Sequence, residues 1–348
     1  MKRNKEYFRG CLVGGAIGDA LGWPVEFLKR KEIVQRFGEG GIQDLVLASS
    51  GKAEITDDTQ MILFTAEGIL RAETRGNAKG ICHPPTVVFY AYQRWLLTQG
   101  YPKVEEYEWI YDGWLLKIKE LYAVRSPGKT CLSSLASRKQ GTMEDPINNS
   151  KGCGGVMRAA PAGLFYPKER AFLLASEYAA LTHGHPSGYL SAGALACIIA
   201  SIIEGSDIEA AVRDSLTELQ NYENHDECTE ILKRALELSR SYLPDEEAIS
   251  QLGEGWVGEE ALGISVYCAL KYPEDFERSV IVSVNHDGDS DSTGSITGNI
   301  LGAYLGIGRI PVDWVSKVEL KEVLIQAADD LLNGYQESEE WWDRYPGY

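Results

Sequence analysis

The sequence has few of the features that mark secreted, membrane or metal-thiolate proteins. Its seven cysteines are odd in number, stand far apart and include no C-x-x-C pair, which argues against a disulfide framework and a cysteine zinc site. No stretch of eighteen uninterrupted apolar residues occurs, so we expect no membrane span. The N-terminal segment lacks the clean apolar stretch and the cleavage site of a signal peptide. We therefore expect a cytoplasmic protein with reduced thiols.

Basic charge is also scarce. The 348 residues include 34 Lys and Arg against 51 Asp and Glu, which gives a net charge of −17. Such a charge repels phosphate at long range, so we expect neither nucleic acid nor a membrane as a partner. A phosphate-bearing ligand stays open, because a local metal or a set of backbone N–H groups reverses the sign within a pocket.

Strand patterns are scarce as well, and the best of them, IQDLVLAS at 42–49, is weak. Apolar residues recur instead at helical spacing. With 44% apolar residues and no Pro- or Ser-rich linker, the chain is predicted to form one compact all-α domain over residues 1–348. The predicted helices span 6–21, 58–73, 86–98, 111–122, 168–181, 187–204, 207–220, 226–241, 245–252, 258–271, 275–284, 292–305 and 319–333.

Three of these helices are rich in Gly, Ala and Ser, namely 10–21, 187–204 and 292–305. Glycine costs a helix about 1 kcal/mol relative to alanine, so we expect these helices to be central ones that neighbours approach closely. Long polar loops are predicted elsewhere. The loop at 123–155, with one helix at 131–139, is long enough to suggest a function. The other predicted loops are 29–55, 74–85 and 334–348.

The segment TDDT at 56–59 stands directly before an apolar helix. Two carboxylates that close repel each other unless a positive group lies on them. Helix capping is one interpretation, because Thr and Asp are preferred N-cap residues and acids suit a helix N-terminus. Capping needs only one such residue, however, and here two carboxylates stand together with a hydroxyl.

A second acidic segment, GDSDS at 288–292, precedes a helix of small residues. It does not fit a calcium EF-hand loop. If Asp287 were the first position of such a loop, Ser292 would stand at position 6, where Gly is needed, and Gly298 at position 12, where Glu is needed. Two all-oxygen clusters that meet in space would hold a hard divalent cation. Zinc is disfavoured, since neither His nor Cys belongs to the set. The six side chains are Thr56, Asp57, Asp58, Asp289, Asp291 and Ser292.

The chain resembles the ADP-ribosylglycohydrolase family, which includes the dinitrogenase-reductase-activating glycohydrolases and the ADP-ribosylhydrolases of animals. The resemblance extends from about Tyr7 to Leu332 and implies an all-α, orthogonal helical bundle with two Mg²⁺ or Mn²⁺ ions at the base of a cleft. Five segments in the family's order carry it: GCLVGGAIGDALGWPVEF (10–27), TDDTQM (56–61), SKGCGGVMRAAPAGL (150–164), THGHP (182–186) and GDSDSTGSITGNILGAYLG (288–306).

The resemblance also implies roles for the acidic residues. The metal ligands would be the six side chains of the two clusters, and Ser292 keeps the hydroxyl where the family often has Thr. Glu26 matches a family glutamate near the metals, on a segment thought to be mobile. The catalytic candidates, which would deprotonate a water or assist the leaving group, are Glu26, Asp58 and Asp289. We expect Asp19 to support the central helix or the metal shell.

On the nucleotide side, the resemblance places ADP-ribose against the segment KGCGGVMR. Bare glycine backbone would approach the pyrophosphate and donate N–H groups. Many family members have Asn at the position of Cys153. His183 matches a family contact to ADP-ribose and Trp256 is a candidate to stack on adenine, whereas His185 and Arg158 are interpreted as structural. The expected ligand-binding residues are Gly152, Cys153, Gly154, Gly155, Met157, His183 and Trp256.

The function implied is hydrolysis of mono-ADP-ribosylated protein at the N-glycosidic bond to arginine, with release of ADP-ribose by a monomer. Two alternatives stay open. The same fold could act on serine-ADP-ribose or O-acetyl-ADP-ribose. The protein could also be a non-catalytic reader of ADP-ribose or an immunity protein against an ADP-ribosylating toxin.

Overall fold

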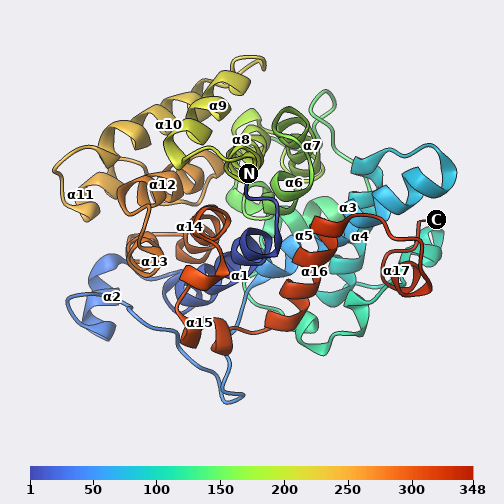
Figure 1. The fold of residues 1–348 in the computed structure, drawn as a ribbon, viewed down its shortest axis with the longest axis horizontal. Helices are drawn as coiled ribbons and strands as arrows, with labels where there is room; N and C mark the ends of the chain where they lie inside the picture. Colours follow the sequence, from blue (N-terminus) through green and yellow to red (C-terminus); the bar gives the residue numbers. More distant parts are fainter. Residues whose placement is uncertain (348) are drawn as a thin grey trace.

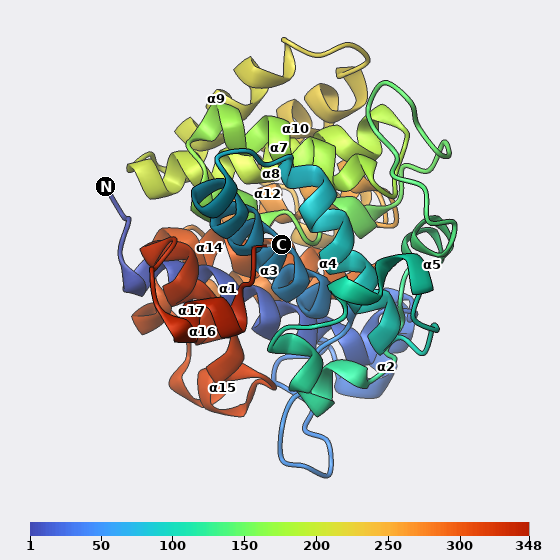
Figure 2. The same ribbon diagram turned by 90° about the vertical axis from the view of Figure 1, so that its right-hand side faces the viewer.

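The structure is a computed structural model that describes residues 1–347. Over this range the regular structure is helical, and the only β-pairing is three isolated bridges, so the prediction of an all-α fold is confirmed. Figures 1 and 2 show α1 and α14 side by side at the centre of the molecule, with the other helices around them. In Figure 1, helices α9 to α12 lie above this pair and to its left, and α3, α4, α16 and α17 lie to its right.

The α-helices are α1 (Lys5–Gly22), α2 (Arg30–Phe37), α3 (Asp57–Lys79), α4 (Pro84–Thr98), α5 (Lys129–Ala136), α6 (Ala160–Phe165), α7 (Lys168–Ala180), α8 (Pro186–Glu204), α9 (Ile208–Leu219), α10 (Asp226–Ser239), α11 (Asp245–Ser250), α12 (Gly258–Lys271), α13 (Phe276–Val284), α14 (Ser290–Leu305), α15 (Val312–Lys317), α16 (Lys321–Asn333) and α17 (Glu339–Arg344). The 3₁₀ turns are η1 (Trp23–Val25), η2 (Glu105–Ile110), η3 (Leu115–Lys117), η4 (Lys119–Tyr122), η5 (Cys153–Gly155) and η6 (Ile307–Arg309).

Glycines at every fourth position join α1 to α14. A Cβ on Gly298 would overlap the carbonyl oxygen of Gly14, and a Cβ on Gly18 would overlap that of Gly294. Residues four apart lie on one face of a helix, so each helix presents a continuous face without side chains. The two backbones therefore lie closer than any larger residue would permit, which confirms the expectation that these helices are central.

Helix α8 is the third central helix. Its length and its mean hydropathy of 1.6 would suffice for a membrane span, although the sequence has no stretch of eighteen uninterrupted apolar residues. Within the fold, 89% of that window is buried by other helices, as in the core of a globular protein. His185 caps the start of α8 by accepting a hydrogen bond from the N–H of Ser187 (3.1 Å), which agrees with a structural role.

Several local predictions are wrong. The predicted helix 111–122 is instead a run of 3₁₀ turns, and near its start Gly113 adopts φ +106°, beside the carboxylate of Glu67, which an α-helix does not allow. The predicted strand at 42–49 takes part only in an isolated bridge between Leu47 and Ala53. Four short helices were missed, two of them in predicted loops, since six to eight residues carry too little periodicity to be recognised. They are α2, α6, α15 and α17.

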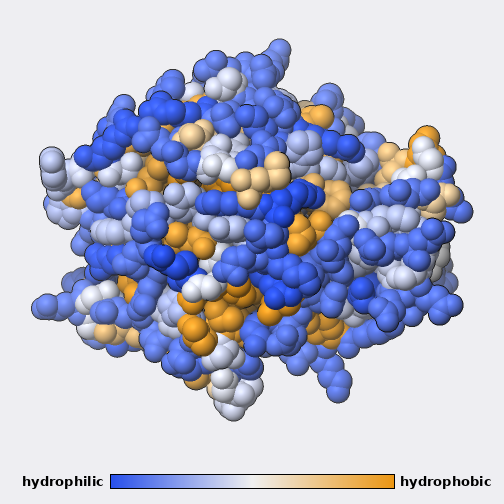
Figure 3. All heavy atoms as spheres, in the orientation of Figure 1, coloured by the Kyte–Doolittle hydropathy of each residue, from blue (hydrophilic) through white to orange (hydrophobic). Residues whose placement is uncertain are grey.

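The surface reflects the acidic composition. In Figure 3 most of the visible face is hydrophilic, with hydrophobic atoms in small groups between polar ones. Scattered apolar residues on a surface are normal and indicate no partner by themselves.

Candidate active site in an acidic cleft

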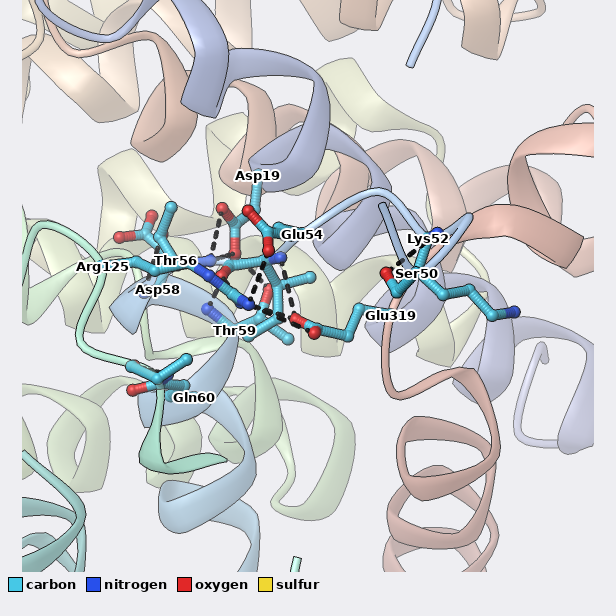
Figure 4. A network of polar contacts seen from close by, with 12 residues as sticks. Asp19, Ser50, Lys52, Glu54, Thr56, Asp58, Thr59, Gln60, Arg125 and Glu319 are labelled. Carbon is cyan, nitrogen blue, oxygen red and sulfur yellow. Dashed lines mark hydrogen bonds and ion pairs between the residues drawn. The ribbon is translucent and has the colours of Figure 1, made fainter. Parts of the chain in front are cut away.

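Helix α1 holds the start of α3, where the first acidic cluster lies. Asp19 is fully buried in α1 and accepts hydrogen bonds from the N–H groups of Thr56 (3.0 Å) and Thr59 (3.2 Å) and from the Thr59 hydroxyl (2.5 Å) (Figure 4). The Thr56 hydroxyl in turn caps α3 by accepting from the N–H of Asp58 (3.3 Å). Burial raises the pKa of Asp19 to about 6, although these hydrogen bonds oppose the shift. Asp19 thus anchors the cluster, as expected.

The end of α1 passes the start of α14 and brings the second cluster to Glu26. A Cβ on Gly22 would overlap the backbone of Ser290, so the two helix ends touch. The turn η1 then directs the chain along the first turn of α14. As a result, carboxylate oxygens of Glu26, Asp289 and Asp291 lie within 4.8 Å of one another. All three side chains are buried, with at most 6% of each residue exposed.

A cleft of about 500 Å³ opens over both clusters. Twelve of the fourteen predicted site residues line it, although they come from six separate parts of the chain. Thr56 and Gly155 are outside the lining found among the described residues. The twelve are Glu26, Asp57, Asp58, Gly152, Cys153, Gly154, Met157, His183, Trp256, Asp289, Asp291 and Ser292.

The base of this cleft buries carboxylates against one another. Burial, and the neighbouring carboxylates after it, raise the pKa of Asp58 and Asp291 well above the usual range. Burial and then Asp289 raise the pKa of Glu26 to about 8. One oxygen of Glu26 and one of Asp58 have no hydrogen-bond partner among residues 1–347. A divalent cation offsets such repulsion, and Mg²⁺, Mn²⁺ and Ca²⁺ prefer oxygen donors, so the residues fit a metal site.

The glycine-rich turn forms one wall of the cleft. A Cβ on Gly154 would lie 2.8 Å from the sulfur of Cys131 and 3.0 Å from the imidazole ring of His183, so a larger residue would require these side chains to shift. The Cys153 thiol donates to a carboxylate oxygen of Asp289 (2.7 Å), which joins this wall to the acidic cluster. Gly155 packs away from the cleft, where a Cβ would lie 2.7 Å from a carbonyl oxygen of α8.

His183 is a neutral base within this wall. Its Nδ1 lies 2.8 Å from the hydroxyl of Thr182, and burial and then Arg158 lower its pKa to about 3. Arg158 is itself only 1% exposed, donates to Thr182 (2.6 Å) and stacks over the ring of Tyr92 (4.2 Å to the centroid). The structure therefore places Arg158 in the core beneath the cleft.

Two aromatic rings stand at the mouth of the cleft. Phe27 and Trp256 stack with their centroids 5.8 Å apart and their planes 18° apart, and both are exposed. An ion pair between Lys29 and Glu254 (2.8 Å) joins the same two segments. The segment that carries Glu26 is thus tied across the entrance by contacts at the surface, beside an indole from which a flat ligand can stack.

Arg125 is a supporting residue that sequence reasoning missed. Its guanidinium donates to the carbonyl of Ile55 (2.7 Å) and to Glu319 (2.6 Å), directly before the first acidic cluster (Figure 4). Positions 55, 125 and 319 are far apart in the sequence and form no pattern that would predict this contact. The loop 123–155 had been singled out only for its length.

The turn after Arg125 also reaches the cleft. The N–H of Gly128 donates to Asp57 (3.2 Å), and Ser126 holds φ +47°, a conformation that is costly for a residue other than glycine. Lys129 begins α5 and is the one Lys or Arg that lines the cleft among the described residues. The prediction of a loop at 123–155 did not indicate which of its residues reach the cleft.

Known proteins resemble this chain over nearly its whole length. The family model described as ADP-ribosylglycohydrolase matches residues 2–340. The chain is 26% identical to the ADP-ribosyl-[dinitrogen reductase] glycohydrolase of Rhodospirillum rubrum over 90% of each protein. It is 23% identical to the ADP-ribosylarginine hydrolase Tri1 of Serratia proteamaculans, over 93% of this chain and 78% of that relative. A solved structure described as an ADP-ribosylglycohydrolase-related protein complex shares the fold, with a TM-score of 0.67 at 23% identity over 96% of this chain and 99% of its own.

Proposed function

The chain belongs to the ADP-ribosylglycohydrolase family, and we propose that it cleaves the N-glycosidic bond between ribose and an arginine side chain of an ADP-ribosylated protein. The products would be ADP-ribose and the unmodified arginine. The observation that carries the proposal is the set of buried carboxylates, without ion-pair partners among residues 1–347, at the base of a cleft of about 500 Å³. The name of the Serratia relative, an ADP-ribosylarginine hydrolase, supports arginine as the acceptor.

We propose that the two acidic clusters hold two Mg²⁺ or Mn²⁺ ions. When bound, such ions orient sugar hydroxyls and lower the pKa of a bound water. The fit rests on the oxygen donors, their burial and the two carboxylate oxygens without partners. The proposed ligands are Thr56, Asp57, Asp58, Asp289, Asp291 and Ser292, of which Thr56 already uses its hydroxyl to cap α3.

The carboxylates of the cleft suit glycoside cleavage. The ribose carbon gains positive charge as the bond breaks, and buried negative charge close to it stabilises that transition state. Glu26 is the proposed residue for proton transfer, because one of its oxygens lies free at the base of the cleft and its backbone belongs to a surface segment. Asp58 and Asp289 are the other catalytic candidates.

The remaining cleft residues are proposed to bind the rest of ADP-ribose. The N–H of Cys153 already donates to the carbonyl of Trp256 (3.2 Å). The first bond within η5 runs from Val156 to Cys153, so the N–H of Gly154 has no partner in that turn and is offered to the pyrophosphate. Gly152 and Met157 line the same wall, next to the neutral ring of His183. At the mouth, Trp256 is placed to stack on adenine.

The test is hydrolysis of defined substrates by the purified full-length chain. Peptides ADP-ribosylated on arginine or on serine, and O-acetyl-ADP-ribose, are incubated with Mg²⁺, Mn²⁺ or EDTA, and released ADP-ribose is measured. We expect release from the arginine peptide with metal and none with EDTA. Faster release from the serine peptide or from O-acetyl-ADP-ribose would show that arginine is not the preferred acceptor. Tight binding of ADP-ribose without turnover of any substrate would indicate a reader or immunity protein.

A further inference from the structure

A second cavity lies at the other end of α3 and is larger than the cleft, at about 630 Å³. Its walls are the C-terminal half of α3, the helix α4, the turn η2 and the chain near Pro346. At 1.5 Å per residue, the thirteen residues from Asp58 to Arg71 separate it from the acidic cleft by roughly 20 Å along α3. The two cavities are therefore distinct sites on the same helix.

The walls of this cavity are basic in a strongly acidic protein. Arg71, Arg75 and Arg94 all line it. Two carboxylates lie against them: Glu67 bonds Arg94 (2.9 Å) and Asp112 bonds Arg71 (2.7 Å). Among residues 1–347, these carboxylates pair with Arg94 and Arg71, and neither forms an ion pair with Arg75.

Two of the three arginines have guanidinium N–H groups without a partner among the described residues. Arg75 makes no ion pair within the part of the chain that the structure describes, and it is half-buried in the wall. Arg94 is 1% exposed, and its Nη2 has no hydrogen-bond partner among the described residues. Buried polar groups without partners are rare in folded proteins and raise the question of what satisfies them.

The rest of the lining is apolar and flat. Tyr90 and Trp109 meet edge to face with their centroids 5.1 Å apart. Trp109 is 51% exposed and Ile81 is 74% exposed, which leaves large apolar side chains in water around the opening. An aromatic wall beside a guanidinium group suits a ligand that has a flat body and an anionic end.

We infer that this cavity binds a small aromatic carboxylic acid. Arg75 takes the carboxylate through paired N–H donors, the geometry in which a guanidinium group binds a carboxylate most strongly. Tyr90 and Trp109 cover the ring.

The experiment is calorimetric titration of the full-length protein with indole-3-acetate, at low salt. Tryptophol, the uncharged analogue, and inorganic phosphate, the anion without a ring, are the matched probes. We expect indole-3-acetate to bind and both other probes to bind at least about tenfold more weakly, since tryptophol lacks the charge-assisted hydrogen bonds and phosphate lacks the ring. Equal binding of tryptophol, tighter binding of adenosine monophosphate, or no binding of indole-3-acetate would overturn the inference.

Variants locate the binding. Arg75→Gln removes the free guanidinium and breaks no ion pair of the described chain, so the protein should stay folded while affinity falls about 10- to 100-fold. Trp109→Ala should also weaken binding, because the ring loses its apolar cover. Lys129→Gln, which alters the cation in the acidic cleft, is the control and should change nothing. Loss of affinity in Lys129→Gln with none in Arg75→Gln would place the probe in the cleft and reject the second site, whatever the outcome for hydrolysis.

Discussion

The two ends of α3 both bury charge, but they do so in opposite ways. At the N-terminal end, Asp57 and Asp58 face further carboxylates, and burial raises the pKa of both well above the usual range. Twenty or so ångströms along the helix, Glu67 is just as deeply buried, at 1% exposure, yet it accepts a hydrogen bond from Arg94 (2.9 Å).

This difference separates a buried carboxylate that has a basic partner in its own chain from buried carboxylates that have none among the described residues. Burying an ionised carboxylate alone is very costly, and a paired charge with good geometry removes most of that cost. Glu67 has such a partner in Arg94, which neutralises its charge (2.9 Å). Asp57 and Asp58 face further carboxylates instead, and the cation that we propose at this end would take the part that Arg94 has at the other.

The strongest way to break the comparison is Asp57→Asn. Hydrolysis should fall to background, because a proposed metal ligand is lost. In EDTA the free energy of unfolding should stay equal or rise, since one source of buried repulsion is removed. Urea denaturation with and without Mg²⁺, alongside turnover, measures both effects. Retained activity, or a large loss of stability in EDTA, would show that Asp57 is a structural residue like Glu67.

Glu26→Gln tests whether the same cluster performs chemistry as well as metal binding. The variant keeps the shape of the side chain but cannot transfer a proton, so the rate should fall by about 10²–10⁴. Affinity for ADP-ribose, measured by calorimetry, should change little. If raising Mg²⁺ or Mn²⁺ restores the rate, Glu26 is mainly a ligand, and an unchanged rate at every metal concentration would remove it from the mechanism.

Glu67→Gln should give the reverse pattern at the paired end. Breaking a buried ion pair by removing one partner costs about 3–5 kcal/mol, because Arg94 is left uncompensated. The matched control is Asp112→Asn, which breaks the more exposed pair with Arg71 and should cost at most about 1 kcal/mol. Neither variant should alter the metal requirement of hydrolysis. Equal stability losses in the two variants would contradict the role assigned to burial.

The smallest expected effect is a pH dependence from His183, the neutral group beside the acidic cluster. Its pKa is lowered to about 3 in the folded protein, mainly by burial. Its contribution to stability is therefore complete above the unfolded value of about 6.5 and is lost as the pH falls toward 3. Between pH 7 and pH 5 the loss should be about 2 kcal/mol. In His183→Asn the free energy of unfolding, measured by denaturation at pH 7 and pH 5, should not show this loss. An equal loss between the two pH values in both proteins would contradict the prediction.

Sequence reasoning located most long helices to within about two residues, because their periodicity extends over three or more turns, but it ended α3 at 73 and placed its last six residues in a loop. It failed for 111–122, where the φ of Gly113 and its packing against Glu67 interrupt the helix. It placed nearly all the predicted site residues in one cleft, but only through resemblance to a family. Arg125 and Lys129 carried no comparable signal, since a single basic residue in a loop looks the same whether it faces solvent or a site.

By itself the sequence determined that two groups of carboxylates stand at the starts of apolar helices, because N-capping and helical spacing are local properties. It also determined that α1 and α14 have faces of glycine, repeated at every fourth position. Only the tertiary structure decided that these faces meet, which brings Asp289 to Glu26, and that Asp19 holds the start of α3 beside them. It alone decided, too, which buried charges find partners, because opposite charges far apart in the chain compensate one another only when packing brings them within a few ångströms.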